Sequence, residues 1–257
     1  LIVPAVLVSC AVAMIADDAG AALLDWTGRL IESTWPLIEV PAAWPLASWS
    51  IAGLDGIAWI AIVLGALAAL SPLPVPGRVA GGVLVVAACL WRPPLVPDGV
   101  ARLTILDVGQ GLSVVIETRG HTLVCDAGPS FRTGSDTGQL VVVPFLRSRG
   151  IRTVDRVVVS HDDDDHKGGA GSVLVLMGAH ALTLGPSLRA SAFDHGRAQL
   201  TRDTCRRGEA WSWDGVGFRW VHPGDVRYQR DNDSSCVLRV SAGGHAAVVY
   251  WTVALVI

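Results

Sequence analysis

Residues 155–169 read DRVVVSHDDDDHKGG, and this stretch decides the fold. Val157 to Val159 form a β-branched apolar run of the kind found in buried strands. Four consecutive aspartates follow, between His161 and His166. Two carboxylates ~4 Å apart repel each other by roughly 4 kcal/mol at an effective dielectric constant near 20. A loop at the end of a buried strand needs a cation to neutralise this charge, and we therefore predict a metal site at the edge of a sheet.

The spacing of the polar residues would allow the loop to bind two metal ions. In an extended loop every second side chain points the same way, so His161 and Asp163 can share one ion. Asp165 and His166 are adjacent and can face a second ion. The alternative is a solvated acidic turn in which both histidines are incidental, because charge runs usually lie on solvated surfaces. The buried strand before the loop and the Gly168-Gly169 pair after it favour the metal site.

The pattern His161-x-Asp163-x-Asp165-His166 resembles the His-x-His-x-Asp-His signature of the metallo-β-lactamase fold, with Asp163 in place of the second histidine. Two further motifs accompany it, Leu106-Asp107-Val108-Gly109-Gln110-Gly111 and Asp126-Ala127-Gly128-Pro129. With them the chain, from residue 1 to about residue 247, resembles the C-terminal part of the ComEC family. Proteins of that family are polytopic channels that carry single-stranded DNA inward during natural transformation.

The resemblance implies an α+β fold, an αββα metallo-β-lactamase-like sandwich preceded by transmembrane helices. It also implies hydrolysis between two divalent ions, and Mn²⁺, Zn²⁺ and Mg²⁺ are all candidates because Asp163 makes the ligand set richer in oxygen. His161 and Asp163 would bind one ion, and Asp165 and His166 the other. Asp126 would orient a ligand from behind, so Asp126 and Asp165 are the expected catalytic residues.

Composition divides the chain into two regions. Of its 257 residues, 51% are hydrophobic and only 17% are charged, which is apolar for a water-soluble protein. Residues 1–97 contain just three of the 20 basic residues, Arg29, Arg78 and Arg92. We therefore predict a membrane region over residues 1–97 and a metallo-β-lactamase-like domain over residues 98–257. The net charge of −3 does not by itself indicate that the protein binds nucleic acid.

Three uncharged runs are candidate membrane segments. Residues 57–70 and 79–91 read as spans, and residues 1–16 as the end of a third, since a crossing takes about 20 residues. Residues 23–38 have helical amphipathicity and predict an interfacial helix. Arg78 lies in the proline-rich turn between the two spans and favours a cytoplasmic turn. This topology predicts an inner or plasma membrane protein whose soluble domain is extracytoplasmic.

The two ends of the sequence suggest a fragment. The chain begins with Leu1 in an apolar run, which is expected of the C-terminal part of a longer membrane protein. After the strand predicted at 248–251 the family pattern has a Gly-Asp pair, whose carboxylate bridges two metals, and later a His-rich loop. Neither the Gly-Asp pair nor the His-rich loop occurs between that strand and the last residue, Ile257. We therefore expect truncation at both ends, weak binding of a second ion and impaired catalysis.

Local patterns predict a meander of strands at 103–106, 113–117 and 122–125, which brings Asp107 and Asp126 to one rim. A helix is predicted over 139–149 despite Pro144, and another after the acidic loop to about residue 177. Two hairpins are predicted over 211–222 and 236–250. His222 reads as a buried structural histidine. Asp231 and Asp233 are either ligands or parts of an Asx turn.

The five cysteines have no Cys-x-x-Cys spacing, which argues against a structural zinc site. Cys205 and Cys236 both lie in the soluble region. They can form a disulfide if that region faces an oxidising compartment, or remain two free buried thiols. The sequence leaves both possibilities open.

Three functions follow from these observations. The first is a metal-dependent phosphodiesterase or nuclease in a DNA-internalisation channel, which transports one strand and degrades the other. The second is a catalytically impaired, membrane-tethered module that positions DNA or a partner. The third is a metallohydrolase acting on another substrate, since fold does not fix function. The expected partners are DNA, the membrane and other proteins of the competence machinery.

Overall fold

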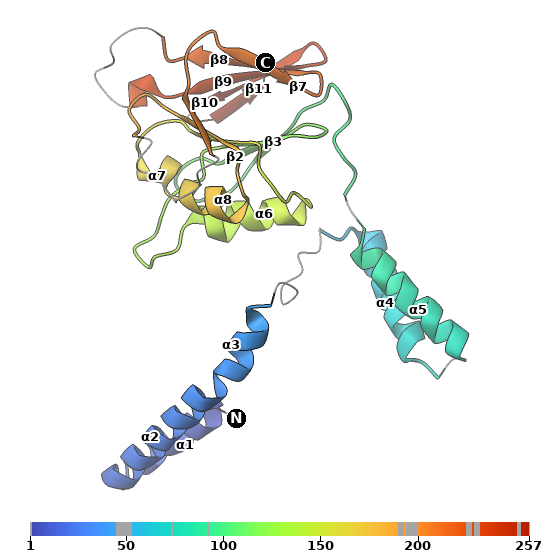
Figure 1. Cartoon of the computed structure of the whole chain (residues 1–257), viewed down its shortest axis with the longest axis vertical. Coiled ribbons are helices and arrows are strands. Elements are labelled where there is room, and N and C mark those ends of the chain that lie inside the picture. The colour runs from blue at the N-terminus through green and yellow to red at the C-terminus, as the bar shows by residue number, and fades with distance from the viewer. Residues whose placement is uncertain are drawn as a thin grey trace. The chain divides into compact units, whose positions relative to one another are not determined.

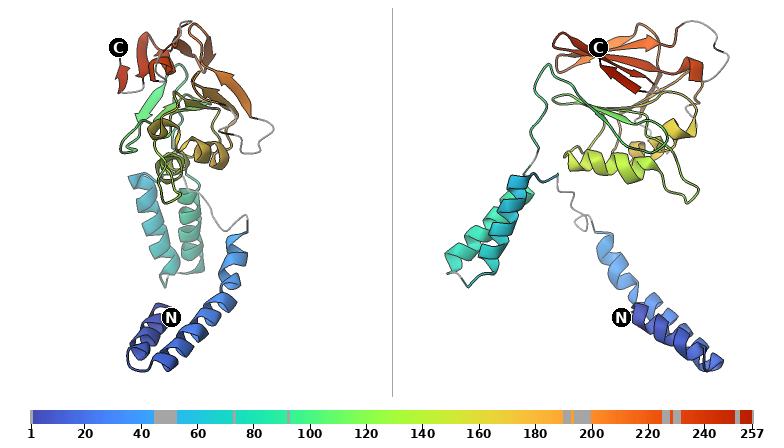
Figure 2. Two further views of the ribbon diagram at one scale, coloured as in Figure 1. Left: turned by 90° about the vertical axis from the view of Figure 1, so that its left-hand side faces the viewer. Right: turned by 180° about the vertical axis from the view of Figure 1, so that it is seen from behind.

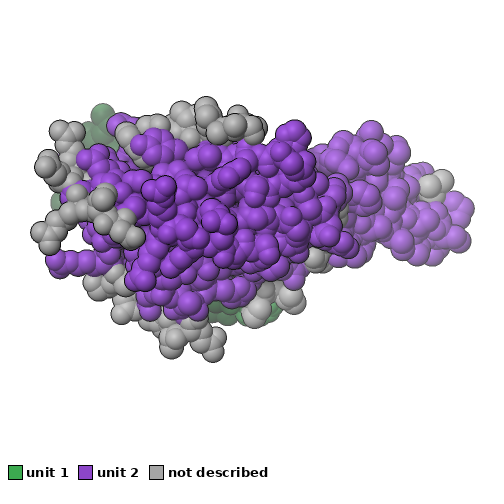
Figure 3. Space-filling view, turned by 90° about the horizontal axis from the view of Figure 1, so that it is seen from above, with its two compact units in different colours: residues 1–50 green, residues 51–257 purple. Residues whose placement is uncertain are grey.

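The structure is a computed structural model that describes residues 2–44, 53–72, 74–91, 93–189, 193, 200–224, 228, 232–250 and 253–256. The chain forms two compact units, residues 1–50 and residues 51–257 (Figure 3). The predicted division into residues 1–97 and 98–257 stays a prediction. Each unit is described by itself.

The first unit consists of three helices, α1 (Ile2–Ala13), α2 (Asp17–Thr34) and α3 (Pro36–Ala42) (Figure 1). α1 packs against α2, with Ser9 and Thr27 buried between them. Gly20 permits this approach, because a Cβ there would lie 2.2 Å from the Cα of Ala13. The amphipathic stretch 23–38 falls on α2 and the start of α3. It is two helices because Pro36 occupies the first turn of the second one.

The second unit begins with a helical hairpin, α4 (Gly56–Leu70) and α5 (Val75–Cys89). Asp55 caps α4 by accepting a 2.8 Å hydrogen bond from the backbone N–H of Ala58. Gly65 and Gly81 lie at the helix crossing, and a Cβ on either would come within 2.7 Å of the other's carbonyl oxygen. Small residues at a crossing let two backbones pack closely.

The predicted spans 57–70 and 79–91 are α4 and α5, but each helix has only 15 residues. At 1.5 Å per residue that is about 22 Å, whereas a hydrocarbon core is about 30 Å thick. Within the described parts of the chain, no helix combines the length and the apolarity that a membrane crossing requires. The expected transmembrane helices are therefore not found there.

The rest of the second unit contains a six-stranded sheet in the order β1-β2-β3-β4-β5-β6. β1 to β3 are antiparallel, and β3 to β6 are parallel. The meander predicted from the sequence is β1 to β3, and the strand before the acidic loop is β4. The bounds are β1 (Arg102–Ile105), β2 (Val114–Glu117), β3 (Thr122–Cys125), β4 (Arg156–Val159), β5 (Ala181–Leu184) and β6 (Thr201–Thr204).

Helices cover one face of this sheet (Figures 1 and 2). They are the π-helical turn η1 (Gly138–Val142), α6 (Val143–Ser148), α7 (Asp164–Lys167) and α8 (Ala170–Leu176). The predicted helix 139–149 is η1 followed by α6. Pro144 is accommodated because it lies in the first turn of α6, where no backbone N–H is needed. Val142, Leu146, Val173 and Leu174 bury this layer against Val115, Val124, Val157 and Val159.

A second, five-stranded sheet has the order β11-β10-β9-β8-β7 and is antiparallel. It contains both predicted hairpins and a strand that the sequence analysis missed, β11, in the stretch after the predicted end of the last hairpin. Residues 251 and 252, between β10 and β11, lie outside the described residues. The bounds are β7 (Ala210–Trp213), β8 (Val216–His222), β9 (Val237–Ala242), β10 (His245–Tyr250) and β11 (Val253–Val256), and the 3₁₀ turn η3 (Asn232–Ser234) precedes β9.

The two sheets pack face to face through a second core (Figure 2). On β2, Val114 and Ile116 point into this core while Val115 points to the helices, as strand alternation requires. Phe218, Trp220 and Leu238 close it from the second sheet. The α+β class and the sheet-on-sheet core agree with the prediction. The described helices that cover a sheet, η1, α6, α7 and α8, lie on the first sheet, so the outer helix layer of the expected αββα sandwich is not seen among the described residues.

Candidate metal centre

The predicted site forms at the carboxyl ends of β3 and β4, which lie side by side and run parallel. Asp126 directly follows β3, and Ser160 and His161 directly follow β4. Asp126 has a positive φ of 55°, which bends its backbone sharply at the strand end. α7 starts three residues after His161 and contains both Asp165 and His166. Two neighbouring strand ends and one short helix thus bring all the predicted residues to one edge of the sheet.

Asp126 organises the centre from behind. Its carboxylate is 1% exposed and accepts three hydrogen bonds. The backbone N–H of Ser160 donates to Oδ1 at 2.7 Å, and the hydroxyl of Ser160 donates to Oδ2 at 2.7 Å. Nδ1 of His166 lies 2.8 Å from Oδ2. A carboxylate only accepts, so Nδ1 of His166 carries the proton and its Nε2 carries the lone pair.

His161 is held in the same tautomer by Ser160. Its Nδ1 lies 2.8 Å from the hydroxyl oxygen of Ser160, whose proton is already donated to Asp126. Nδ1 of His161 is therefore the donor, and Nε2 carries the lone pair. The two imidazole rings lie 4.2 Å apart between centroids. Both histidines thus turn an Nε2 lone pair toward the aspartates, which is the arrangement of metal-ligating histidines.

The electrostatic surroundings distinguish the two rings. Burial, and then the neighbouring His166, lowers the pKa of His161 below its usual value. Burial alone would also lower the pKa of His166, but the hydrogen bond and charge of Asp126, together with Asp165 and Asp163, outweigh it and raise that pKa. His161 is the ring that stays neutral most readily, and a neutral imidazole is the form that binds a metal.

Each histidine faces one aspartate. Nε2 of His161 lies 3.2 Å from Oδ2 of Asp163, and Nε2 of His166 lies 3.9 Å from Oδ2 of Asp165. A nitrogen lone pair and a carboxylate oxygen at these distances repel each other unless a proton on Nε2 or a metal cation lies between them. The donor set of two imidazoles and two carboxylates suits a divalent ion. The residues present therefore fit a metal.

The four residues form two pairs rather than one cluster. Among the described residues, no group of three or more His, Cys, Asp and Glu side chains lies close enough to hold one ion. The pairs are those expected from the alternation of the loop, His161 with Asp163 and His166 with Asp165. Metal binding by these residues stays a prediction.

The other two aspartates of the acidic run have structural partners. Asp162 forms an ion pair with Lys167, and Asp164 accepts a 2.9 Å hydrogen bond from the hydroxyl of Ser130. The charge of the run is thereby divided among separate partners. For Asp163 and Asp165 the choice between a metal site and a solvated acidic turn stays open.

The loop over residues 106–111 supports the centre through its backbone. Gly111 has a φ of +122°, and a Cβ there would lie 2.0 Å from the carbonyl oxygen of Asp165. The next N–H, that of Leu112, donates to that same carbonyl at 3.3 Å. Asp107 does not join the site; its Oδ1 accepts from the N–H of Gly109 at 3.1 Å in an Asx turn.

Two residues of the centre were not predicted from the sequence. Ser160 reads as the last residue of a strand, and its role appears only when Asp126 is placed beside it. Asn232, in η3, donates from Nδ2 to Oδ2 of Asp163 at 2.9 Å. Asp233 is exposed, and Asp231 lies outside the described residues. Nδ1 of His222 lies 2.8 Å from the carbonyl oxygen of Ser235, in line with a structural role.

A disulfide between Cys205 and Cys236 lies beside the centre. Cys205 follows β6 in the first sheet and Cys236 precedes β9 in the second, so the bond joins the sheets. The backbone N–H of Cys236 donates to the carbonyl of Ser160 at 3.1 Å. Of the two possibilities left open by the sequence, the structure has the disulfide.

Fold and site together define a metallo-β-lactamase-type domain. A family model for the metallo-beta-lactamase superfamily matches residues 106–248, more than half of the chain, and the chain belongs to this superfamily. Its fold generally binds divalent metal ions such as zinc. A metallo-beta-lactamase of Cronobacter sakazakii, a HARLDQ-motif mutant, aligns with 56% of this chain and 59% of its own at 16% identity and a TM-score of 0.40.

Two relatives carry names from DNA metabolism. The chain is 32% identical to Competence protein ComA of Neisseria gonorrhoeae over 91% of this chain and 30% of the relative. It is 34% identical to Recombination protein 2 of Haemophilus influenzae over 58% of this chain and 18% of the relative. The chain thus resembles the C-terminal domain of ComEC-type competence proteins, and it spans less than a third of either relative.

Proposed function

We propose that the chain is part of a DNA-internalisation system for natural transformation, and that its metallo-β-lactamase-type domain is a metal-dependent phosphodiesterase acting on DNA. The observation that carries the proposal is the pairing of each Nε2 lone pair with a carboxylate, at 3.2 Å for His161 and 3.9 Å for His166. The names of the two competence and recombination relatives support DNA as the substrate. Other competence proteins would be the partners.

In this proposal His161 and Asp163 hold one divalent ion, and Asp165 and His166 hold a second. Asp126 and Ser160 fix both imidazoles so that their Nε2 atoms face Asp163 and Asp165. Asn232 orients Asp163. Asp165 is half-exposed and lies where it can accept a proton from the incoming water. Divalent ions bound here would polarise the phosphodiester and make that water more acidic.

We further propose that the domain works outside the cytoplasm, at the inner or plasma membrane. The Cys205–Cys236 disulfide supports an oxidising compartment, because such bonds are rare where thiols are kept reduced. The hairpin α4–α5, whose only charged side chain is Arg78, has exposed Ile57, Trp59 and Ile60 and a close glycine crossing, which supports insertion into or against a membrane. Protease added outside spheroplasts should cleave the domain; cleavage only after lysis would place it in the cytoplasm.

The nuclease proposal is tested on the purified chain with end-labelled single- and double-stranded DNA in Mn²⁺, Zn²⁺ or Mg²⁺. Because weak binding of a second ion is expected to impair catalysis, we expect slow, metal-dependent cleavage that chelation stops and that His161→Ala and Asp163→Asn abolish. Asp162→Asn is the matched control, since Asp162 belongs to the same acidic run but pairs with Lys167. Equal loss in the Asp162 and Asp163 variants would contradict the proposed ligand set.

A second candidate function is a non-catalytic module that positions DNA or a partner. It is favoured by the absence, among the described residues, of any group of three metal ligands. Metal stoichiometry discriminates between the two. Two ions per chain with cleavage support the phosphodiesterase, and DNA binding without bound metal or cleavage supports the positioning module.

A further inference from the structure

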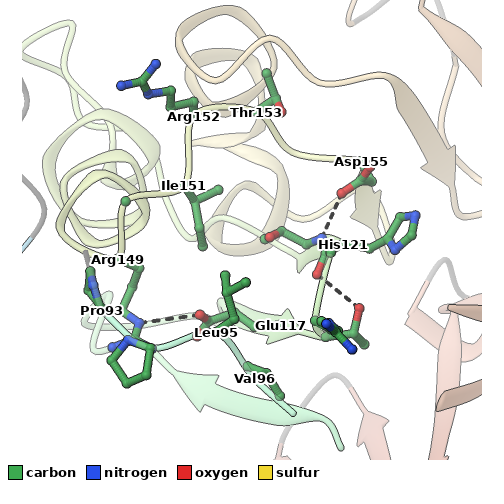
Figure 4. A pocket seen from close by; sticks show the side chains of 16 residues that line it. Pro93, Leu95, Val96, Glu117, His121, Arg149, Ile151, Arg152, Thr153 and Asp155 are labelled. Atoms are coloured by element: carbon green, nitrogen blue, oxygen red, sulfur yellow. Dashed lines mark hydrogen bonds and ion pairs between the residues drawn. The ribbon is translucent and has the colours of Figure 1, made fainter. Parts of the chain in front are cut away.

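A second site lies at the opposite end of the first sheet. A pocket of about 310 Å³ is lined by the carboxyl end of β2, the β2–β3 turn, the segment after α6 and the residues 93–96 that follow the helical hairpin (Figure 4). Thr122 and Asp155 lie at the amino ends of β3 and β4 here, whereas Asp126 and His161 follow the carboxyl ends. Its volume is at the lower end of the range for small-molecule sites.

Glu117 is the buried polar group of this pocket. The residue is 7% exposed, and its Oε1 lies 3.4 Å from Nε of Arg149 and 3.6 Å from a terminal nitrogen of Arg102. Its Oε2 is buried and has no hydrogen-bond partner among the described residues. Burial raises the pKa of Glu117, and the charge of Arg102 opposes that shift. A buried oxygen of this kind is costly until a donor reaches it, so the pocket calls for a ligand with an N–H or O–H group.

The charged groups at the opening of the pocket favour the binding of an anion as well. Arg119, Arg149 and Arg152 line the pocket, and only Glu117 and Asp155 oppose them. Asp155 is already engaged, because its Oδ2 accepts from the backbone N–H of Thr122 at 2.8 Å. Arginine pairs with phosphate through parallel N–H groups, which makes a phosphate the natural anion for this mouth.

The pocket also has an apolar wall. Leu95, Val96 and Ile151 line it, and Figure 4 shows Ile151 pointing toward Leu95 and Glu117. Leu95 is 75% exposed, which leaves apolar surface uncovered at the pocket. A ligand with a flat apolar face would cover it and remove that surface from water.

We propose that this pocket binds a mononucleotide whose base carries an amino group. The base lies against Leu95 and Ile151, its amino group donates to Oε2 of Glu117, and its phosphate is held by Arg149 and by Arg152, whose exposed side chain points away from the pocket in Figure 4 and turns inward on binding. A single nucleotide satisfies the buried acceptor, the basic mouth and the apolar wall together, whereas inorganic phosphate satisfies only the mouth.

The decisive comparison is between dCMP and dUMP, which differ at position 4 of the base by an amino group against an oxo group. Calorimetric titration of the full chain with a chelator present, which keeps the metal centre empty, should show dCMP binding about tenfold or more tightly than dUMP. Inorganic phosphate should bind more weakly than either nucleotide. Equal binding of dCMP and dUMP, phosphate binding as tight as dCMP, or no nucleotide binding would each overturn the proposal.

Glu117→Gln tests the contact itself. The amide oxygen of Gln will take the position of Oε1, because Arg149 only donates hydrogen bonds there. The NH₂ group therefore takes the position of Oε2. The preference should then reverse toward dUMP, whose oxo group accepts. Retention of the dCMP preference in a variant whose thermal midpoint is unchanged would contradict the assigned contact.

Arg152→Ala keeps the proposal testable even if Glu117→Gln unfolds, because Arg152 is exposed. It should weaken dCMP and dUMP severalfold and leave their ratio unchanged. Arg147→Ala is the matched control, since Arg147 is also exposed, lies in α6 and does not line the pocket. Equal effects of the two arginine variants would argue against a phosphate at the pocket mouth.

Discussion

Asp126 controls the candidate metal centre without facing the proposed ions. It fixes His166 directly and His161 through Ser160. Asp126→Asn keeps the shape of the side chain, but an amide NH₂ in place of Oδ2 can accept from neither the Ser160 hydroxyl nor Nδ1 of His166. We expect affinity for Zn²⁺ or Mn²⁺ to fall about 10–100-fold, the usual effect of removing a group that orients metal-ligating histidines. Metal titration at neutral pH measures this, with Asp162→Asn as the control. Unchanged affinity in Asp126→Asn would show that these histidines are not ligands.

Gly111 and Gly109 form a matched pair in the loop behind the site. Both have positive φ values, +122° and +75°, so alanine at either position carries a backbone cost of about 1–3 kcal/mol. Only at Gly111 would the new Cβ also collide with the carbonyl of Asp165, whereas Gly109 has open space. Urea unfolding should therefore show Gly111→Ala to be clearly less stable than Gly109→Ala. The same order is expected for metal affinity, because the collision displaces Asp165. Equal stabilities would mean that the loop can move away without cost.

The residues of the candidate site differ in how far the sequence reveals them. His161, Asp163, Asp165 and His166 are predictable because they lie within six residues of sequence; alternation pairs His161 with Asp163, and adjacency pairs Asp165 with His166. Asp126 was reached through the motif that it begins and the strand that precedes it. Ser160 and Asn232 could not be found, because their roles depend on contacts with Asp126, 34 residues away, and Asp163, 69 residues away.

At the scale of elements, the turns of the two sheets are joined by Asp214. Asp214 lies in the β7–β8 turn. Its Oδ2 accepts hydrogen bonds from the hydroxyl of Thr118 and the backbone N–H of Gly120, each at 2.7 Å, and lies 3.0 Å from Nδ1 of His121. These three residues lie in or beside the β2–β3 turn. The hydrogen bonds from Thr118, His121 and Gly120 lower the pKa of Asp214 to about 2. A lowered carboxyl pKa stabilises the fold above the unfolded value near 3.9, and that contribution is lost as the pH falls toward 2.

Asp214→Asn should therefore be less stable than the parent at pH 7, and the difference should shrink between about pH 4 and pH 2. The effect should be modest, because this turn is near the surface and water screens its charges. Urea unfolding across this pH range provides the measurement, with Asp98→Asn as an exposed control. A stability difference independent of pH would mean that the Asp214 charge contributes nothing.

Which strands could be predicted depends on what holds them. β2, β3 and β4 are buried on both faces, so their apolar runs are visible in the sequence. β6 reads Thr-Arg-Asp-Thr and is exposed throughout; it is a strand because it pairs with β5 and because Arg156 from β4 binds its Asp203. Such an exposed edge strand has no alternation of apolar and polar residues from which it could be predicted. β11 is a strand because it pairs antiparallel with β10, and this pairing was not predicted from the sequence.

At the scale of the whole molecule, alternation on the central strands sets the layers, since Val114 and Ile116 face one core and Val115 the other. The layered domain was therefore predictable from pattern and family resemblance. The membrane spans were predicted from hydropathy and from the family resemblance. Hydropathy reports an apolar run but not where turns divide it, and the described helices have 15 residues where the prediction required about 20.

The Cys205–Cys236 disulfide is the only disulfide cross-link between the two sheets in the described part of the chain, and it closes a loop with a sequence separation of 31 residues. A cross-link of this length stabilises a fold by about 3–4 kcal/mol in the chain-entropy model. The double substitution of Cys205 and Cys236 by alanine should lower the free energy of unfolding by about that amount. Cys89→Ala, which removes a free thiol, should change it little. The double variant should also weaken metal binding, because the disulfide holds in place the backbone N–H of residue 236, which donates to the carbonyl of Ser160.

Thiol counting checks the bond itself. Alkylation in denaturant without a reductant should modify three cysteines, Cys10, Cys89 and Cys125, and after reduction it should modify all five. Five reactive thiols in protein isolated without reductant would show that the sheets are joined by packing alone. The support for an oxidising compartment would then be lost as well, while the pairing of His161 with Asp163 would stand unaffected, because it rests on β4 and α7.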